Sequence, residues 1–111
     1  MKKFLVLYHA PISAKKQMAK ATPEQAKAGM DAWMKWAKKN AKKIVDLGLP
    51  LGDSGNVTGK KITKGKGTLG GYSILQSRDL ASVTKSFNGH PHLMMKGTWI
   101  QVHEFLPMPG M

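Results

Sequence analysis

Short runs of hydrophobic residues predict four main strands. Residues 4–8 form an unbroken apolar run, which is typical of a strand covered on both faces. Further strands are predicted over residues 44–48 and 72–76, because each is rich in β-branched or aromatic residues and adjoins glycines. The last strand, residues 99–106, alternates so that both of its faces carry large apolar side chains. We therefore expect a sheet with two faces that both need cover.

Helices are predicted between these strands. A long helix is expected to begin at Pro23, after a capping-box sequence that starts at Thr22. A weak helical turn is expected over residues 12–20, and a second helix over residues 78–87 with Ser77 as its N-cap. The predicted buried face of the long helix follows three- and four-residue steps and consists of Ala26, Met30, Trp33, Met34, Ala37 and Ala41.

The order of these elements predicts an α+β fold in one domain, residues 1–111. A glycine- and lysine-rich segment, residues 48–71, is expected to form a loop or hairpin that holds one short strand. The whole order indicates a ferredoxin-like β-α-β-β-α-β antiparallel sheet with the helices on one face. Because two helices cover one face only, we expect a second copy of the chain to cover the other, giving a homodimer.

Composition narrows the possible chemistry. The 111 residues include no cysteine, which excludes disulfides, cysteine-ligated metals and thiol nucleophiles, and we predict no cofactor. The N-terminal apolar run is shorter than a signal peptide requires, and no run approaches the roughly 18 apolar residues of a membrane span. We therefore expect a cytoplasmic protein that does not contact a membrane.

The formal net charge of +12 raises the question of nucleic acid, because lysines bind phosphates without reading sequence. The lysines are scattered along the chain, and no aromatic residues are interleaved with them as stacking platforms. Nucleic-acid binding is therefore disfavoured, although Lys60–Lys66 keeps open the alternative of a non-catalytic polyanion or nucleic-acid binding module. Residues 65–70 match a dinucleotide glycine pattern, but a predicted strand follows them where that motif needs a helix.

Histidines and the scarce carboxylates are the remaining candidates for chemistry. His90 and His92 flank a proline in a predicted tight loop, but two histidines without a third ligand at fixed spacing do not predict a metal site. His9 lies at the end of the first strand, and His103 on the last strand is read as a structural or interface residue. Asp31 lies on the lysine side of the long helix, where a surface ion pair is the simplest interpretation.

Several short segments together resemble the YCII-related domain family. They cover almost the whole chain and are residues 4–8, 22–25, 44–48, 71–75, 89–93 and 104–107. The resemblance implies a dimeric α+β barrel and a small enzyme whose substrate is not settled. It also implies an acid–base pair formed by a residue of the first long helix and a residue just before a proline.

At these two positions the chain has Asp31 and His90, so the resemblance implies that the usual histidine and aspartate are exchanged. We predict His90 as the acid–base group and Asp31 as the residue that orients it. His9, His92 and Tyr72 are predicted substrate-binding residues, and the excess of lysine favours a small anionic metabolite as the ligand.

Overall fold

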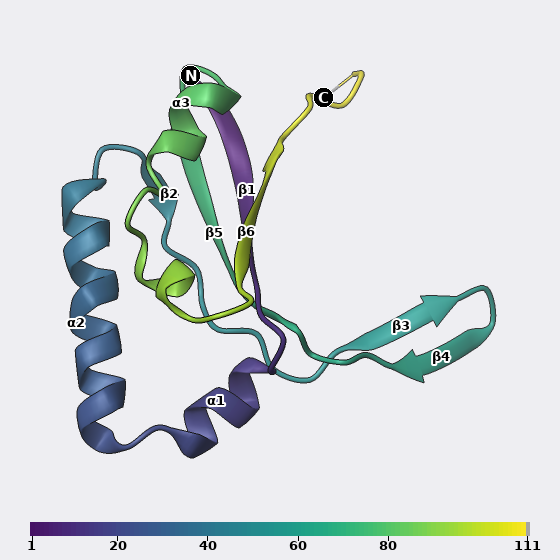
Figure 1. The fold of residues 1–111 in the computed structure, drawn as a ribbon. Coiled ribbons are helices and arrows are strands. Elements are labelled where there is room, and N and C mark those ends of the chain that lie inside the picture. Colours follow the sequence, from purple (N-terminus) through teal and green to yellow (C-terminus); the bar gives the residue numbers. More distant parts are fainter. Residues whose placement is uncertain (111) are drawn as a thin grey trace.

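The computed structural model describes residues 1–110, with a four-stranded antiparallel sheet at the centre of the fold (Figure 1). The strands lie in the order β2-β5-β1-β6, and each pairs antiparallel with its neighbours. This confirms the predicted ferredoxin-like α+β class. The elements are β1 (Lys2–His9), α1 (Ala14–Lys20), α2 (Pro23–Lys39), β2 (Ile44–Asp46), β3 (Gly55–Thr58), β4 (Lys61–Lys64), β5 (Leu69–Ser77), α3 (Leu80–Lys85), the 3₁₀ turn η1 (Pro91–Met94) and β6 (Trp99–Glu104).

Strand β1 lies in the middle of the sheet and defines its two faces. Phe4, Val6 and Tyr8 are buried on the inner face, whereas Leu5 and Leu7 on the outer face are only half-buried. Successive side chains of a strand point to opposite faces, so the apolar run supplies both faces at once. Within one chain, only the inner face is covered by helices.

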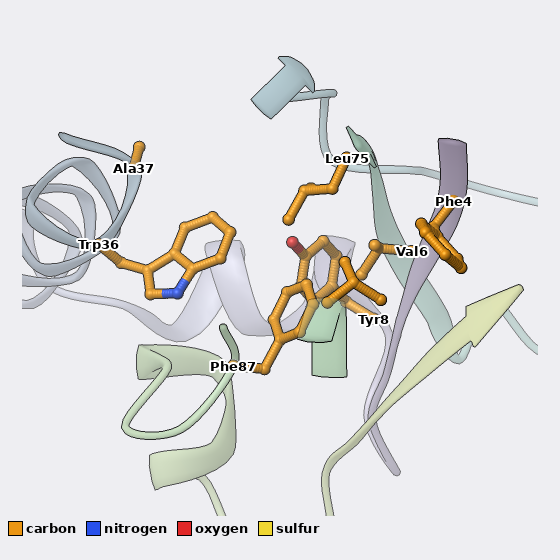
Figure 2. Close-up of a cluster of buried hydrophobic side chains, with 8 residues drawn as sticks. Phe4, Val6, Tyr8, Trp36, Ala37, Leu75 and Phe87 are labelled. Atoms are coloured by element: carbon orange, nitrogen blue, oxygen red, sulfur yellow. The ribbon is translucent and has the colours of Figure 1, made fainter. Parts of the chain in front are cut away.

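The inner face packs against α2 and α3. Trp36 and Ala37 from α2 and Val83 from α3 join the buried side chains of β1 and β5. Figure 2 shows the rings of Trp36, Tyr8 and Phe87 converging between α2 and β1. The indole Nε1–H of Trp36 donates to the backbone oxygen of Ser86 at 2.8 Å, which satisfies its polar atom inside the core.

The predicted buried face of α2 is partly wrong. Met30 and Met34 are 62% and 49% exposed, whereas Trp36, left out of that face, is only 6% exposed. The helix begins at Pro23 as predicted, and Thr22 and Gln25 form the expected reciprocal capping box. Its first two turns are exposed on all sides, because α2 contacts the sheet only through its C-terminal half.

The second helix is shorter than predicted. It spans Leu80–Lys85, and its N-cap is Asp79, whose carboxylate accepts from the backbone N–H of Ser82 at 2.8 Å. Ser77 is not the cap because it still pairs with Lys2 at the end of β5.

The glycine- and lysine-rich segment forms a hairpin that projects from the body of the molecule (Figure 1). It contains two strands, β3 and β4, where one was predicted, and every residue of both is exposed. Gly48 is the first residue of this segment and has a φ of +82°, and a Cβ there would collide with the carbonyl oxygen of Tyr72. No helix within residues 1–110 is long and apolar enough to cross a membrane.

Candidate functional site

His90 is the fully buried ionisable side chain next to the core. It follows Gly89, whose φ of +74° turns the chain after α3, and it is the N-cap of η1. Its side chain is 0% exposed. The imidazole Nδ1 accepts a hydrogen bond from the backbone N–H of His92 at 3.0 Å, and Nε2 has no hydrogen-bond partner. A buried polar atom without a partner is rare and calls for an explanation.

Aromatic rings surround this imidazole. The ring of Tyr8 stacks on it at a centroid distance of 5.3 Å, and Phe87 lies at 5.7 Å. Trp33 and Trp36 from α2 each meet it in T-shaped geometry at 4.5 Å. The surroundings of Nε2 are therefore apolar, and a charge there would be poorly solvated.

Burial accordingly lowers the pKa of His90 from 6.5 to about 4, and the charge of nearby His92 adds to the shift. The imidazole is neutral at pH 7. Because Nδ1 accepts from a backbone N–H, the single ring proton is on Nε2. The site thus holds a neutral N–H donor without an acceptor.

Tyr8 contributes its ring but not a free hydroxyl. Ser73 Oγ donates to the carbonyl oxygen of Leu47 at 2.6 Å, so the Tyr8 hydroxyl donates to Ser73 Oγ at 2.9 Å. Burial raises the pKa of Tyr8 to about 12. At neutral pH this hydroxyl stays protonated and hydrogen-bonded to Ser73. His90 is therefore the side chain of the cluster that can still make a further hydrogen bond.

The predicted hydrogen bond between Asp31 and His90 is absent. Asp31 lies exposed on α2, and the partner of His90 Nδ1 is a backbone N–H where a carboxylate was expected. The physical reason is the rotation of α2, which directs Trp33 and Trp36 towards His90 and leaves Asp31 on the solvent side. Asp31 therefore does not orient the imidazole in this structure.

Of the three predicted substrate-binding residues, His92 alone reaches His90. Its Nε2–H donates to the backbone oxygen of His9 at 2.8 Å, which ties η1 to the end of β1. The side chain of His9 lies on the outer face of the sheet, stacked on Trp99 at 4.8 Å. Tyr72 also faces outwards, where its hydroxyl donates to Asp46 at 3.4 Å. The sheet separates His9 and Tyr72 from His90 because neighbouring residues alternate between its faces.

Residues 1–110 form at least two surface cavities, and His90 lines neither of these two. The first, of about 260 Å³, lies between α3, η1 and the inner face of β6. The second, of about 360 Å³, lies between α1 and residues 49–52, with Lys15 at its wall. The first cavity has no charged side chain in its lining, which consists of Thr84, Phe87, Asn88, Leu93, Thr98, Trp99, Ile100 and Val102.

The arrangement of side chains gives little support for a metal site or for a polyanion-binding site. Within residues 1–110, no three histidine, aspartate or glutamate side chains gather closely enough to hold a metal ion. Lys60, Lys61 and Lys64 lie exposed on the projecting hairpin, and Lys66 is exposed beside it. Residues 55–66 contain no aromatic side chain on which a base could stack.

Sequence analysis missed Trp36 and Phe87 as neighbours of His90. Trp33, Trp36, Ala37 and Asn40 follow an i, i+3, i+4, i+7 pattern, so a signal for the second tryptophan was present. The competing pattern Met30, Trp33, Met34 and Ala37 is apolar at all four positions, so it outweighed the pattern that ends on Asn40. Nothing in the local sequence marked Phe87, which lies in the turn after α3.

Comparisons with known proteins bear on the fold. No protein-family model matches the chain. No curated protein matches it either. Among solved structures, the chain is similar to a 5-chloro-2-hydroxyhydroquinone dehydrochlorinase from Burkholderia phenoliruptrix, in complex with 2,5-dihydroxybenzoquinone, with 15% identity, a TM-score of 0.50 and 91% of each chain covered. This likeness supports a distant relationship in fold.

Proposed function

We propose that the protein is a YCII-like small-molecule enzyme in which the Nε2–H of His90 donates a hydrogen bond to an oxygen of the substrate. One observation carries this proposal: His90 is completely buried, and its Nε2 has no partner. A buried donor left unpaired costs on the order of 1–3 kcal/mol, and a ligand oxygen that accepts from it would recover that energy.

The neutral state of His90 decides which chemistry it supports. With a pKa of about 4, the imidazole does not hold a second proton at pH 7. Its Nδ1 lone pair is engaged by the backbone N–H of His92, so it is not free to abstract a proton. A fixed N–H donor in an apolar environment instead stabilises negative charge that develops on a carbonyl or enolate oxygen. We therefore assign His90 as a hydrogen-bond donor to the reacting group.

The fold of the structural neighbour is compatible with such a ligand. That protein was solved with 2,5-dihydroxybenzoquinone, a ring compound with carbonyl and hydroxyl oxygens. A ligand of this chemistry would suit both parts of the present site, since the aromatic side chains pack against its ring and His90 Nε2–H donates to one of its oxygens.

We further propose that the chain acts as a homodimer through the outer face of the sheet. Leu5 and Leu7 from β1 lie at the centre of this face, and Ile74 from β5 and Trp99 from β6 flank them. Trp99 is 51% exposed in the single chain. A sheet face that carries several large apolar side chains and no covering helix is normally covered, and a second copy covers it with the same surface.

Calorimetric titration tests the role of His90. The ligands are a panel of small ring ketones, quinones and phenols, and the variant is His90→Asn, because an asparagine N-cap also accepts from the backbone N–H two residues on. Thr63→Asn, which places the same side chain on the exposed hairpin strand β4, is the matched control. At least one ligand is expected to bind the wild type and the control equally and to lose tenfold or more in affinity for His90→Asn. Equal binding of every ligand to all three proteins would refute the assignment.

A further inference from the structure

We infer that the 260 Å³ cavity between α3, η1 and β6 binds the ring of an uncharged single-ring compound, with Phe87 as the partition between that ring and His90. The inference deepens the proposed function by naming a substrate class, and it rests on that function only where it assigns the partner of His90.

Phe87 belongs to both the cavity and the His90 cluster. Its side chain lines the cavity, and its ring centroid lies 5.7 Å from that of His90. It is also stacked on Trp36 at 5.3 Å. The floor of the cavity adjoins the same cluster, because Ile100 in its lining pairs in register with Tyr8, and Tyr8 stacks on His90. One phenyl ring therefore borders both an uncharged cavity and the imidazole that carries the unpaired N–H donor.

The size and lining of the cavity limit what it can hold. A dry apolar cavity of roughly 150 Å³ is enough to bind benzene. The present volume of about 260 Å³ therefore suits one ring with a short substituent and is too small for a nucleotide. None of its lining residues is charged, which favours an uncharged ligand over the anionic metabolite expected from the lysine content.

The Phe87 ring determines how far such a ligand penetrates. While the Phe87 ring stands between the cavity and the imidazole, the ring of a bound ligand contacts Ile100 and Val102 without reaching His90. Once the ring turns or is shortened, a carbonyl oxygen on the ligand can accept from Nε2–H. Phe87 is thus a specificity-determining residue, because the position of its ring decides whether the acceptor oxygen of a ring ligand can reach His90.

Two probes of nearly equal shape separate these contributions. Acetophenone and ethylbenzene share a ring and a two-carbon substituent, but acetophenone alone has a carbonyl acceptor. Binding is followed by the NMR shifts of the Ile100 and Val102 methyl groups, in the wild type and in Phe87→Leu. Leu93→Trp fills the cavity, and Met18→Trp places the same side chain in the second cavity as the matched control.

Both probes are expected to shift the Ile100 and Val102 methyls of the wild type and of Met18→Trp, but not those of Leu93→Trp. In Phe87→Leu the affinity for acetophenone relative to ethylbenzene should rise threefold or more, and Phe87→Leu/His90→Asn should abolish that gain. The absence of methyl shifts, or an unchanged affinity ratio in Phe87→Leu, would overturn the inference. Neither result changes the outcome expected from the His90→Asn calorimetry, so a failure of this inference can be distinguished from a failure of the proposed function.

Discussion

Acidification from pH 7 to pH 5 should destabilise the protein through His90. The folded protein buries this imidazole in the neutral form with a pKa of about 4, whereas the unfolded chain restores the ordinary value of 6.5. Between these two values the unfolded state binds the extra proton, so the free energy of unfolding falls as the pH falls. The stability associated with neutral burial is present above pH 6.5 and is lost progressively towards pH 4.

The expected magnitude follows from the two pKa values. A difference of one pKa unit corresponds to about 1.4 kcal/mol, so linkage gives a loss of about 2 kcal/mol between pH 7 and pH 5. Asp79 does not interfere in this window, because a backbone hydrogen bond from Ser82 holds its pKa below 3.8.

Urea unfolding followed by tryptophan fluorescence at pH 7, 6 and 5 measures the effect. His90→Asn keeps a cap for the backbone N–H of His92 and has no titrating group, so its stability should fall by about 2 kcal/mol less than that of the wild type over this range. Thr63→Asn, on the exposed hairpin strand β4, should follow the wild type. If the wild type and His90→Asn lose stability in parallel, His90 is not buried as a neutral group.

Two further predictions concern the two faces of the sheet. Leu7→Lys on the outer face should convert the proposed dimer to a monomer in sedimentation velocity, whereas Val57→Lys on the exposed hairpin should leave the mass unchanged. A dimeric Leu7→Lys protein would refute this interface. On the inner face, Tyr8→Phe should cost about 1 kcal/mol, because Ser73 keeps its bond to the oxygen of Leu47. Ser73→Ala should cost more, up to about 3 kcal/mol, since it leaves the Tyr8 hydroxyl buried without a partner. Urea melts of the two variants compare these costs, and the opposite order would contradict the direction of the hydrogen-bond chain.

Local sequence was sufficient for the elements that depend on neighbouring residues. The apolar run at residues 4–8, the capping box at Thr22 and the order of strands and helices led to the correct fold class, because period and capping act within a few residues. His90 was also identified as a candidate from its loop, since a histidine before a proline that follows a helix stop is a local feature.

Tertiary structure alone determined what surrounds His90. The rotation of α2 about its axis depends on which large side chains fit against β1, and the face through Met30 and Met34 is the more apolar one in sequence. Packing selected Trp33 and Trp36, which placed Asp31 in solvent and replaced the expected carboxylate by aromatic rings. The chemistry of a histidine depends on its desolvation and on the partners of its two nitrogens. The partner of Nδ1 is the nearby backbone N–H of His92, whereas the desolvation is set by Tyr8, Trp33 and Trp36, which lie far away in the chain. The sequence therefore predicted which imidazole to examine, and only the fold made it a neutral, unpaired donor.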